Sequence, residues 1–196
     1  EISESAPETL ARHYTEGGLF DKAVSYWRRA AERASGRYAN TEAIGHYRKG
    51  LAALARLPES NERIDLELGL RLGLIASLRL ADRYDDALAE LDQAESLAVG
   101  NNRIAELARI HHLRGNIYFP LGKIDQCLTE HRTAWEFARQ SGSIENEARA
   151  LGGIGDAHYM AGRMSSAHEH FDRCVALCRE HGFDLIEIEY LPMRAS

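Results

Sequence analysis

The residues Gly115-Asn116-Ile117-Tyr118-Phe119-Pro120-Leu121-Gly122-Lys123-Ile124 decide the fold, because their pattern returns 40 residues later in the sequence. The second copy reads Gly155-Asp156-Ala157-His158-Tyr159-Met160-Ala161-Gly162-Arg163-Met164. The residues that follow correspond too: Cys127, His131 and Ala134 match Ala167, Phe171 and Cys174, and a weaker copy upstream keeps Ile75, Leu78, Asp82, Tyr84, Ala87, Leu91 and Ala94. A fixed period of this size indicates a solenoid, in which each helical hairpin buries its apolar face by stacking on its neighbours.

The spacing inside each copy resembles the tetratricopeptide repeat. That family places small residues where two helices approach closely, as at Gly115 and Gly155, and a glycine where the chain reverses, as at Gly122 and Gly162. The resemblance implies an all-α fold, a right-handed α-solenoid of antiparallel helical hairpins. The period of about 40 residues exceeds the family's usual length of about 34, so we expect longer helices and extended loops.

The hydrophobic pattern predicts ten helices, near residues 7–17, 20–35, 40–56, 60–81, 84–99, 102–120, 124–141, 144–161, 164–181 and 184–191. The expected N-caps are Asn40, Ser60, Asn102, Ser143 and Ser165, and the expected breaks are Gly17-Gly18, Gly36, Pro58, Gly100, Gly142 and Gly182. We therefore divide one continuous solenoid into degenerate repeat-like helices over 1–57, repeats over 58–101, 102–142 and 143–182, and the first helix of a truncated repeat or a capping helix over 183–196.

A second resemblance lies in the first 57 residues. Pro7-Glu8-Thr9-Leu10-Ala11-Arg12-His13-Tyr14-Thr15-Glu16-Gly17-Gly18-Leu19, with the later Tyr26-Trp27-Arg28-Arg29-Ala30, resembles the segment after the nucleotide-binding domain of large bacterial signalling ATPases. In that group a class III adenylate/guanylate cyclase or DNA-binding domain precedes the ATPase. Because the sequence begins at Glu1 and ends in an apolar helix, we expect a fragment of such a longer protein.

Composition narrows the function classes. The chain has 196 residues and a formal net charge of −6, which disfavours a nucleic-acid partner held by phosphate neutralisation. No apolar run approaches the roughly 18 residues of a membrane span, and no secretory signal is evident. The three cysteines form no CxxC pair, which suits a reducing compartment, so we predict a cytoplasmic protein without membrane attachment.

No set of catalytic residues stands out. Phosphate-binding loops need GxxxxGK[ST], or GxGxxG after a strand, and neither is present. The nearest segment, Gly152-Gly153-Ile154-Gly155, lies inside a predicted helix, where close packing is the better interpretation. His170, Cys174 and Cys178 share a helix face at spacings that suit zinc, but buried cysteines act as small apolar residues, and packing is favoured again. We therefore predict no enzyme activity, no cofactor and no metal in these residues.

A concave recognition surface remains. In the tetratricopeptide family the first helix of each hairpin lines the groove, and the resemblance assigns fifteen positions of this chain to it. Nine of them form the candidate groove: Arg79, Arg109, His112, Asn116, Phe119, Arg149, Asp156, Tyr159 and Met160. Arginine, asparagine and aromatic side chains along one trough suit an extended peptide or an acidic segment. The alternative is an ordinary solvated helix face. The carboxylate clamp of chaperone-type repeats is not predicted, because His112 and Gly153 replace its lysine and second asparagine.

The leading hypothesis is a regulatory scaffold that binds a partner protein, a peptide or another domain of its own parent chain. A small-ligand sensor is the alternative, and an apolar pocket between repeats would favour it. A third hypothesis is a homodimer through the C-terminal helix, formed by Ile186, Ile188 and Leu191. Recognition of RNA is the weakest hypothesis, because the chain lacks a basic stripe.

Overall fold

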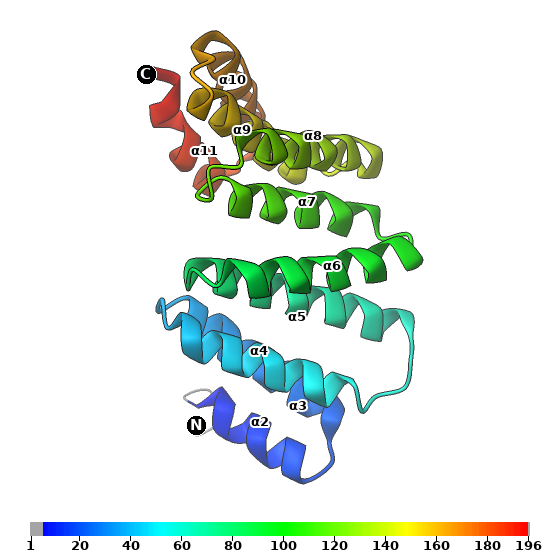
Figure 1. Ribbon diagram of the computed structural model, residues 1–196. Coiled ribbons are helices and arrows are strands. Elements are labelled where there is room, and N and C mark those ends of the chain that lie inside the picture. The colour runs from blue at the N-terminus through cyan, green and yellow to red at the C-terminus, as the bar shows by residue number, and fades with distance from the viewer. Residues whose placement is uncertain (1–5, 196) are drawn as a thin grey trace. The chain divides into compact units, whose positions relative to one another are not determined.

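A computed structural model describes residues 6–195, and the regular elements in that range are all helices (Figure 1). They are α2 (Pro7–Glu16), α3 (Phe20–Ser35), α4 (Asn40–Leu54), α5 (Asn61–Leu80), α6 (Tyr84–Gly100), α7 (Ile104–Tyr118), α8 (Ile124–Ser141), α9 (Ile144–Met160), α10 (Met164–His181), α11 (Asp184–Tyr190) and the 3-10 helix η1 (Leu191–Ala195). Each helix predicted from the sequence is present, and its bounds differ from the prediction by at most two residues.

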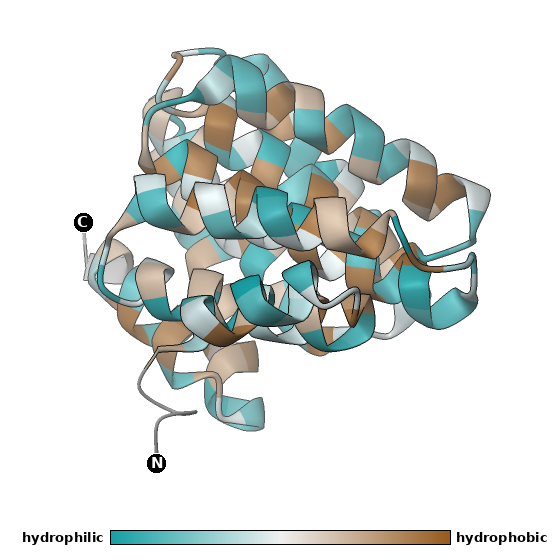
Figure 2. Cartoon of the chain, turned by 90° about the horizontal axis from the view of Figure 1, so that it is seen from below, coloured by the Kyte–Doolittle hydropathy of each residue, from teal (hydrophilic) through white to brown (hydrophobic). Residues whose placement is uncertain are grey.

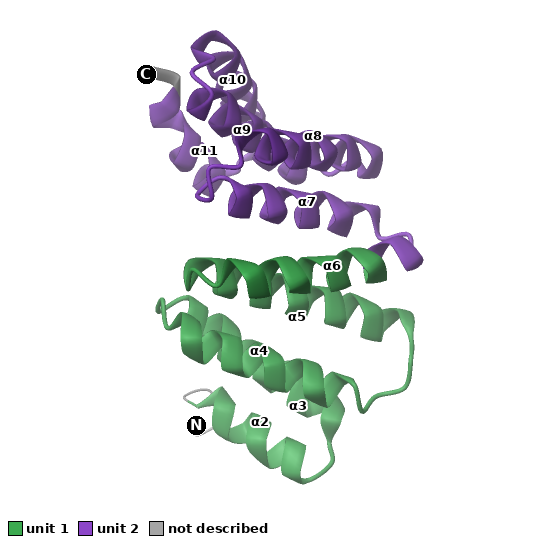
Figure 3. Cartoon of the chain, in the orientation of Figure 1, with its two compact units in different colours: residues 1–97 green, residues 98–196 purple. Residues whose placement is uncertain are grey.

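The chain divides into two compact units, residues 1–97 and residues 98–196 (Figure 3). In unit 1 each helix packs against the next, α2 on α3, α3 on α4 and α4 on α5, and α3 also contacts α5. In unit 2 the same order holds from α7 to α11, and α9 contacts both α7 and α11. Each unit is thus a stack of antiparallel hairpins in which alternate helices also touch. The finer division into repeats, and their continuity as one solenoid, stay predictions.

Hydrophilic and hydrophobic residues alternate along the helices, as Figure 2 shows. The apolar side chains of each helix pack against the neighbouring helices, because a single hairpin cannot bury them alone. Among the described helices, none is long and apolar enough to cross a bilayer.

The glycines predicted to permit close packing do so. A Cβ atom built at Gly115 would lie 2.6 Å from the ring of His131, and one at Gly155 would lie 2.5 Å from Phe171, so each glycine admits a large side chain from the partner helix of its own hairpin. A Cβ atom at Gly153 would meet His131 at 2.4 Å. The segment Gly152–Gly155 is therefore a packing element of α9, as the sequence indicated.

The chain reverses at residues with a left-handed backbone, and these recur in the sequence register. Gly122 and Gly162 have φ of 68° and 70°, and Asp82 has φ of 55° at the matching position of the weaker copy. A second series, again spaced by 40 residues, comprises Gly142 and Gly182, which cap α8 and α10, and Asn102, with φ of 53°. Asparagine and aspartate tolerate this conformation better than other non-glycine residues. The weaker copy therefore keeps the turns although it has lost the glycines.

Two of the five predicted N-caps are confirmed and three are wrong. The hydroxyls of Ser60 and Ser143 accept from the backbone N–H groups of Arg63 and Asn146. The side-chain amide of Asn40, by contrast, donates to the carbonyl of Leu80, and Asn102 lies in a left-handed turn. Ser165 lies inside α10, whose N-cap is Arg163. At these three positions backbone hydrogen bonds from the preceding turn set the start of the helix, and the polar side chain does not cap it.

The C-terminal helix is held by unit 2 more firmly than the sequence suggested. Ile186 and Tyr190 are buried in a cluster with Phe171, Cys174 and Val175 of α10 and with residues of α9. The exposed apolar residues are instead Leu185 at 83 %, Ile188 at 69 % and Leu191 at 39 %. The predicted homodimer stays a prediction, but its test must avoid Ile186, because a polar residue there would unfold the helix itself.

Candidate functional site

Eight of the nine candidate groove residues lie on or directly after α7 and α9, which pack against each other in unit 2. We call this surface the first-helix face: Arg109, His112, Asn116, Phe119, Arg149, Asp156, Tyr159 and Met160. The ninth residue, Arg79, lies on α5 in unit 1. The eight residues differ strongly in how far they are available to a partner.

The part of the face on α7 is polar and partly preorganised. Arg109 is exposed, while His112 and Asn116 are half-buried one helical turn apart. The side-chain amide of Asn116 donates to Nε2 of His112 over 3.0 Å. Because an amide nitrogen only donates, Nε2 of His112 must be the accepting nitrogen. The Asn116 carbonyl oxygen remains an acceptor that this bond does not use.

Below this surface lies His131 of α8, which is 1 % exposed. Its ring centroid is 5.2 Å from that of His112, and it fills the space left by Gly115 and Gly153. Burial lowers the pKa of His131 to about 4, although the nearby carboxylate of Glu130 acts in the opposite direction. His131 is therefore neutral near pH 7 and acts as a packing residue, not as a base.

A buried polar cluster beside it ties α7 to α8. Nδ1 of His111 lies 2.7 Å from a carboxylate oxygen of Glu130, and the guanidinium of Arg114 lies 3.7 Å from the same oxygen. His111 also stacks on Phe137 with ring centroids 5.4 Å apart. The Glu130 carboxylate of α8 thus joins two buried side chains of α7, and its removal would take a charged partner from both, so we assign this cluster to stability.

The part of the face on α9 is partly covered by α11. Tyr190 lies against Gly152, where a Cβ atom would come within 2.3 Å of its ring, and its hydroxyl donates to Asp156. Burial, followed by the charge of Glu189, raises the pKa of Asp156 to about 7, while the bond from Tyr190 acts in the opposite direction. The sequence placed Asp156 in an open groove; the structure places it under the C-terminal helix.

The remaining residues of the first-helix face also differ in how exposed they are. Tyr159 and Met160 are exposed at the end of α9, and Arg149 is half-buried and paired with Glu145 of its own helix at 2.8 Å. Phe119, in contrast, packs against the cluster of Cys127, Leu128, Ile154 and Ala157. The accessible part of the first-helix face is thus Arg109, His112, Asn116, Arg149, Tyr159 and Met160.

Two of the three residues considered for zinc are packed in the core, and the third, His170, is half-buried. Cys174 and Cys178 are buried in unit 2, and burial raises the pKa of both thiols. Nδ1 of His170 donates to the carbonyl of Ser166 over 2.7 Å. Within residues 6–195 no group of three or more histidine, cysteine, aspartate or glutamate side chains is arranged to hold a metal ion. Their positions agree with the packing interpretation.

Sequence reasoning missed one feature, a pocket between α2, α3 and α4 of unit 1. Its aromatic and basic lining residues were present in the sequence at Phe20, Trp27, Lys49 and Arg56. Of these four only Trp27 belongs to the segments that resemble signalling ATPases, and no repeated spacing marks the other three.

Comparison with known proteins supports the repeat assignment. Residues 106–180 match the tetratricopeptide repeat family. No curated protein matches the chain in sequence. The matched region comprises α7 to α10 almost completely, and these helices are tetratricopeptide-like.

Solved structures confirm the predicted all-α solenoid class. BtubC (BKLC) from P. vanneervenii has a TM-score of 0.72 at 17 % identity, covering 91 % of this chain and 72 % of its own. Aspartyl phosphate phosphatase F from Bacillus subtilis has 0.76 at 14 %, covering 94 % and 53 %. A Rap protein complexed with Competence and Sporulation Factor has 0.74 at 16 %, covering 84 % and 45 %. The chain spans about half the length of the last two proteins.

Proposed function

We propose that this chain is a non-catalytic scaffold module that binds a protein or peptide through the accessible part of its first-helix face. One observation carries the proposal. The helices α7 and α9, which pack against each other, present arginine, asparagine, tyrosine and methionine side chains that are exposed or half-buried. Helical repeats commonly use such extended surfaces for partners. A Rap protein with this fold has been crystallised with Competence and Sporulation Factor, which supports a role in binding.

The chemistry of the face favours an acidic segment with an apolar residue. Arg109 and Arg149 provide planar donors for carboxylates, and Tyr159 and Met160 provide exposed apolar surface at the end of α9, the helix that also carries Arg149. The ion pair of Arg149 with Glu145 has exposed partners, so a partner's carboxylate replaces it at little cost. Asn116 adds an amide for the backbone of an extended chain.

We further propose the setting that the sequence suggested: a cytoplasmic module of a larger bacterial signalling ATPase or cyclase, whose partner is either a separate protein or another domain of the same chain. The resemblance of residues 7–30 to the region after the ATPase domain supports this proposal. The parent's activities would lie outside these residues.

The test is titration of the 196-residue chain with an array of acidic peptides and with the isolated ATPase domain of the parent. Arg109→Ala and Tyr159→Ala should weaken binding about tenfold each, because each removes a charged or aromatic contact. Arg132→Ala, an exposed arginine on α8, is the matched control and should bind as the unchanged chain does. The proposal would be refuted if Arg132→Ala weakened binding as much as Arg109→Ala and Tyr159→Ala do, or if the chain bound neither the peptides nor the ATPase domain.

A further inference from the structure

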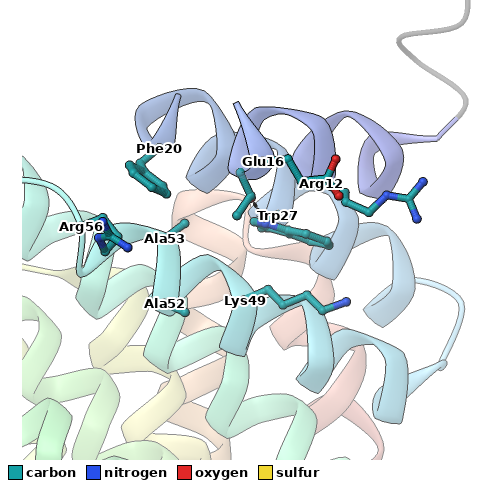
Figure 4. A pocket seen from close by; sticks show the side chains of 9 residues that line it. Arg12, Glu16, Phe20, Trp27, Lys49, Ala52, Ala53 and Arg56 are labelled. Atoms are coloured by element: carbon teal, nitrogen blue, oxygen red, sulfur yellow. Dashed lines mark hydrogen bonds between the residues drawn. The ribbon is translucent and has the colours of Figure 1, made fainter. Parts of the chain in front are cut away.

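A pocket of about 460 Å³ lies in unit 1 between α2 and α4, with α3 beside them. Figure 4 shows its nine lining residues: Arg12, Thr15, Glu16, Phe20, Trp27, Lys49, Ala52, Ala53 and Arg56. The volume falls in the range of about 300 to 1,000 Å³ that small-molecule sites occupy. None of these residues belongs to the first-helix face, so the pocket needs an explanation of its own.

The wall of the pocket is apolar because its polar atoms are already satisfied. Trp27 is 5 % exposed, and its indole N–H donates to the hydroxyl of Thr15 over 3.0 Å. That hydroxyl in turn donates to the carbonyl of Ala11 over 2.7 Å. What Trp27 offers to the cavity is therefore ring surface, which Phe20 and Ala53 extend.

The rim carries an excess of positive charge. Arg12, Lys49 and Arg56 face one acidic residue, Glu16. Within residues 6–193, these three cations form no ion pair with a carboxylate. Instead, Nζ of Lys49 lies 4.8 Å from the centroid of Trp27, and the guanidinium of Arg56 lies 5.0 Å from that of Phe20. Lys49 and Arg56 are thus held at the apolar wall, and no carboxylate in the described part of the chain forms an ion pair with either of them or with Arg12.

The charges are grouped at the two ends of the pocket. In Figure 4, Phe20 and Arg56 lie at one end, and Arg12 and Lys49 extend at the other, beyond the ring of Trp27. A second cavity of about 180 Å³ shares Arg12, Trp27 and Lys49 and continues past them to His46 and to the carboxylate of Glu8. Across the two cavities the three cations still outnumber the two carboxylates, Glu8 and Glu16. The end with two cations is therefore roomy enough for a charged group next to the indole.

We propose that this pocket binds a small organic anion, with its aromatic or aliphatic body on Trp27 and Phe20 and its oxyanion group between Arg12 and Lys49. A wholly apolar ligand would leave the cations without a partner, and a cationic ligand would be repelled by them. An inorganic anion would not use the ring surface. The combination of an apolar wall with a cationic end selects an amphipathic anion.

The test is calorimetric titration of the chain with 2-naphthoate, with 2-naphthyl phosphate and with the neutral 2-naphthalenemethanol. We expect one saturable site for the anions and at least about tenfold weaker binding of the alcohol. The relative affinity of the two anions identifies the preferred oxyanion. No saturable binding of either anion at millimolar concentration, or equal binding of the alcohol, would overturn the proposal.

Variants locate the site. Lys49→Gln and Arg12→Gln should each weaken naphthoate binding about tenfold, and Ala52→Phe should abolish it by filling the cavity. Arg48→Gln, the exposed neighbour of Lys49 on α4, is the matched control and should leave the affinity unchanged. Circular dichroism melting identifies any variant that fails to fold. If folded Lys49→Gln and Arg48→Gln bind naphthoate alike, the ligand does not occupy this pocket.

Discussion

The ring of Tyr190 occupies the space that a side chain at Gly152 would need, since a Cβ atom there would lie 2.3 Å from it. Forty positions earlier in the sequence, His112 on α7 corresponds to Gly152, and Ala150 on α9 corresponds to Tyr190. The earlier pair has its large residue on the first of its two helices, whereas the pair of Gly152 and Tyr190 has it on the second. The helix α11 thus docks on α9 where a glycine leaves room for a large side chain, as Gly115 and Gly155 do for His131 and Phe171.

Gly152→Ala should loosen this docking. The added methyl group must displace the Tyr190 ring, and overpacking of this kind costs about 1–3 kcal/mol. Amide hydrogen exchange in α11 should become faster, and the urea midpoint should fall. Gly69→Ala on α5 is the control: nothing lies within 4 Å of its Cβ position, so we expect a gain of about 0.5–1 kcal/mol. Unchanged exchange in α11 would contradict the packing assigned to Tyr190.

A double variant tests the contact between Gly152 and Tyr190 itself. When Tyr190→Ala is added to Gly152→Ala, a small residue on α9 faces a small one on α11, and the clash is removed. The two changes should therefore cost less free energy of unfolding together than the sum of the single variants, by about 0.5–3 kcal/mol. Strict additivity would mean that the residues do not touch.

Asp156 should make unit 2 less stable as the pH rises. Its pKa is raised to about 7 in the folded chain, from an ordinary value of 3.8. Between these values the folded state holds a proton that the unfolded state has released, so this group's contribution to stability is lost from about pH 4 to pH 7. Urea unfolding from pH 5 to pH 8 should show this loss, and Asp156→Asn should reduce it. Identical pH profiles for the two proteins would exclude this role.

His131 should act in the opposite direction. Its pKa is lowered to about 4 from 6.5, so between these values the unfolded state binds the extra proton and stability falls as the pH falls. His131→Phe, which copies Phe171 of the next repeat, should fold and should lose less stability between pH 7 and pH 4.5 than the unchanged chain. A steeper acid loss in the variant would show that His131 is not the titrating group.

At two matching left-handed turns, substitutions should change the free energy of unfolding in opposite directions. Asn102→Gly should raise the free energy of unfolding by a few tenths of a kcal/mol up to about 1, because glycine adopts positive φ without strain. Gly142→Ala, 40 residues later, should lower it by about 1 kcal/mol. Thermal melts of both variants check the pair. Changes of the same sign would indicate that the turns relax to another backbone conformation.

The repeat pattern predicted the helices and the close approach of helices at Gly115 and Gly155, because side-chain size at a fixed interval can be read directly from the sequence. It did not predict that Asp156 is covered, since that depends on how α11, although itself predicted, docks on α9 through Tyr190 and Gly152. It also missed the pocket at Trp27, because the gap between α2 and α4 arises from how three helices meet. The N-cap errors at Asn40 and Ser165 have a similar cause: a suitable residue type does not fix the local backbone.

One imidazole links two hairpins in unit 2. His131 fills the hole at Gly115 in its own hairpin and the hole at Gly153 in the next. In most helical arrays neighbours melt semi-independently, with an interface energy coupling each to the next. Because His131 packs inside its own hairpin and also against the next hairpin, separating the two hairpins would disturb the interior of the first. Neither contact can therefore open while the other stays closed. Residues 104–181 should therefore unfold in a single cooperative step, without a populated state in which one pair of helices has frayed.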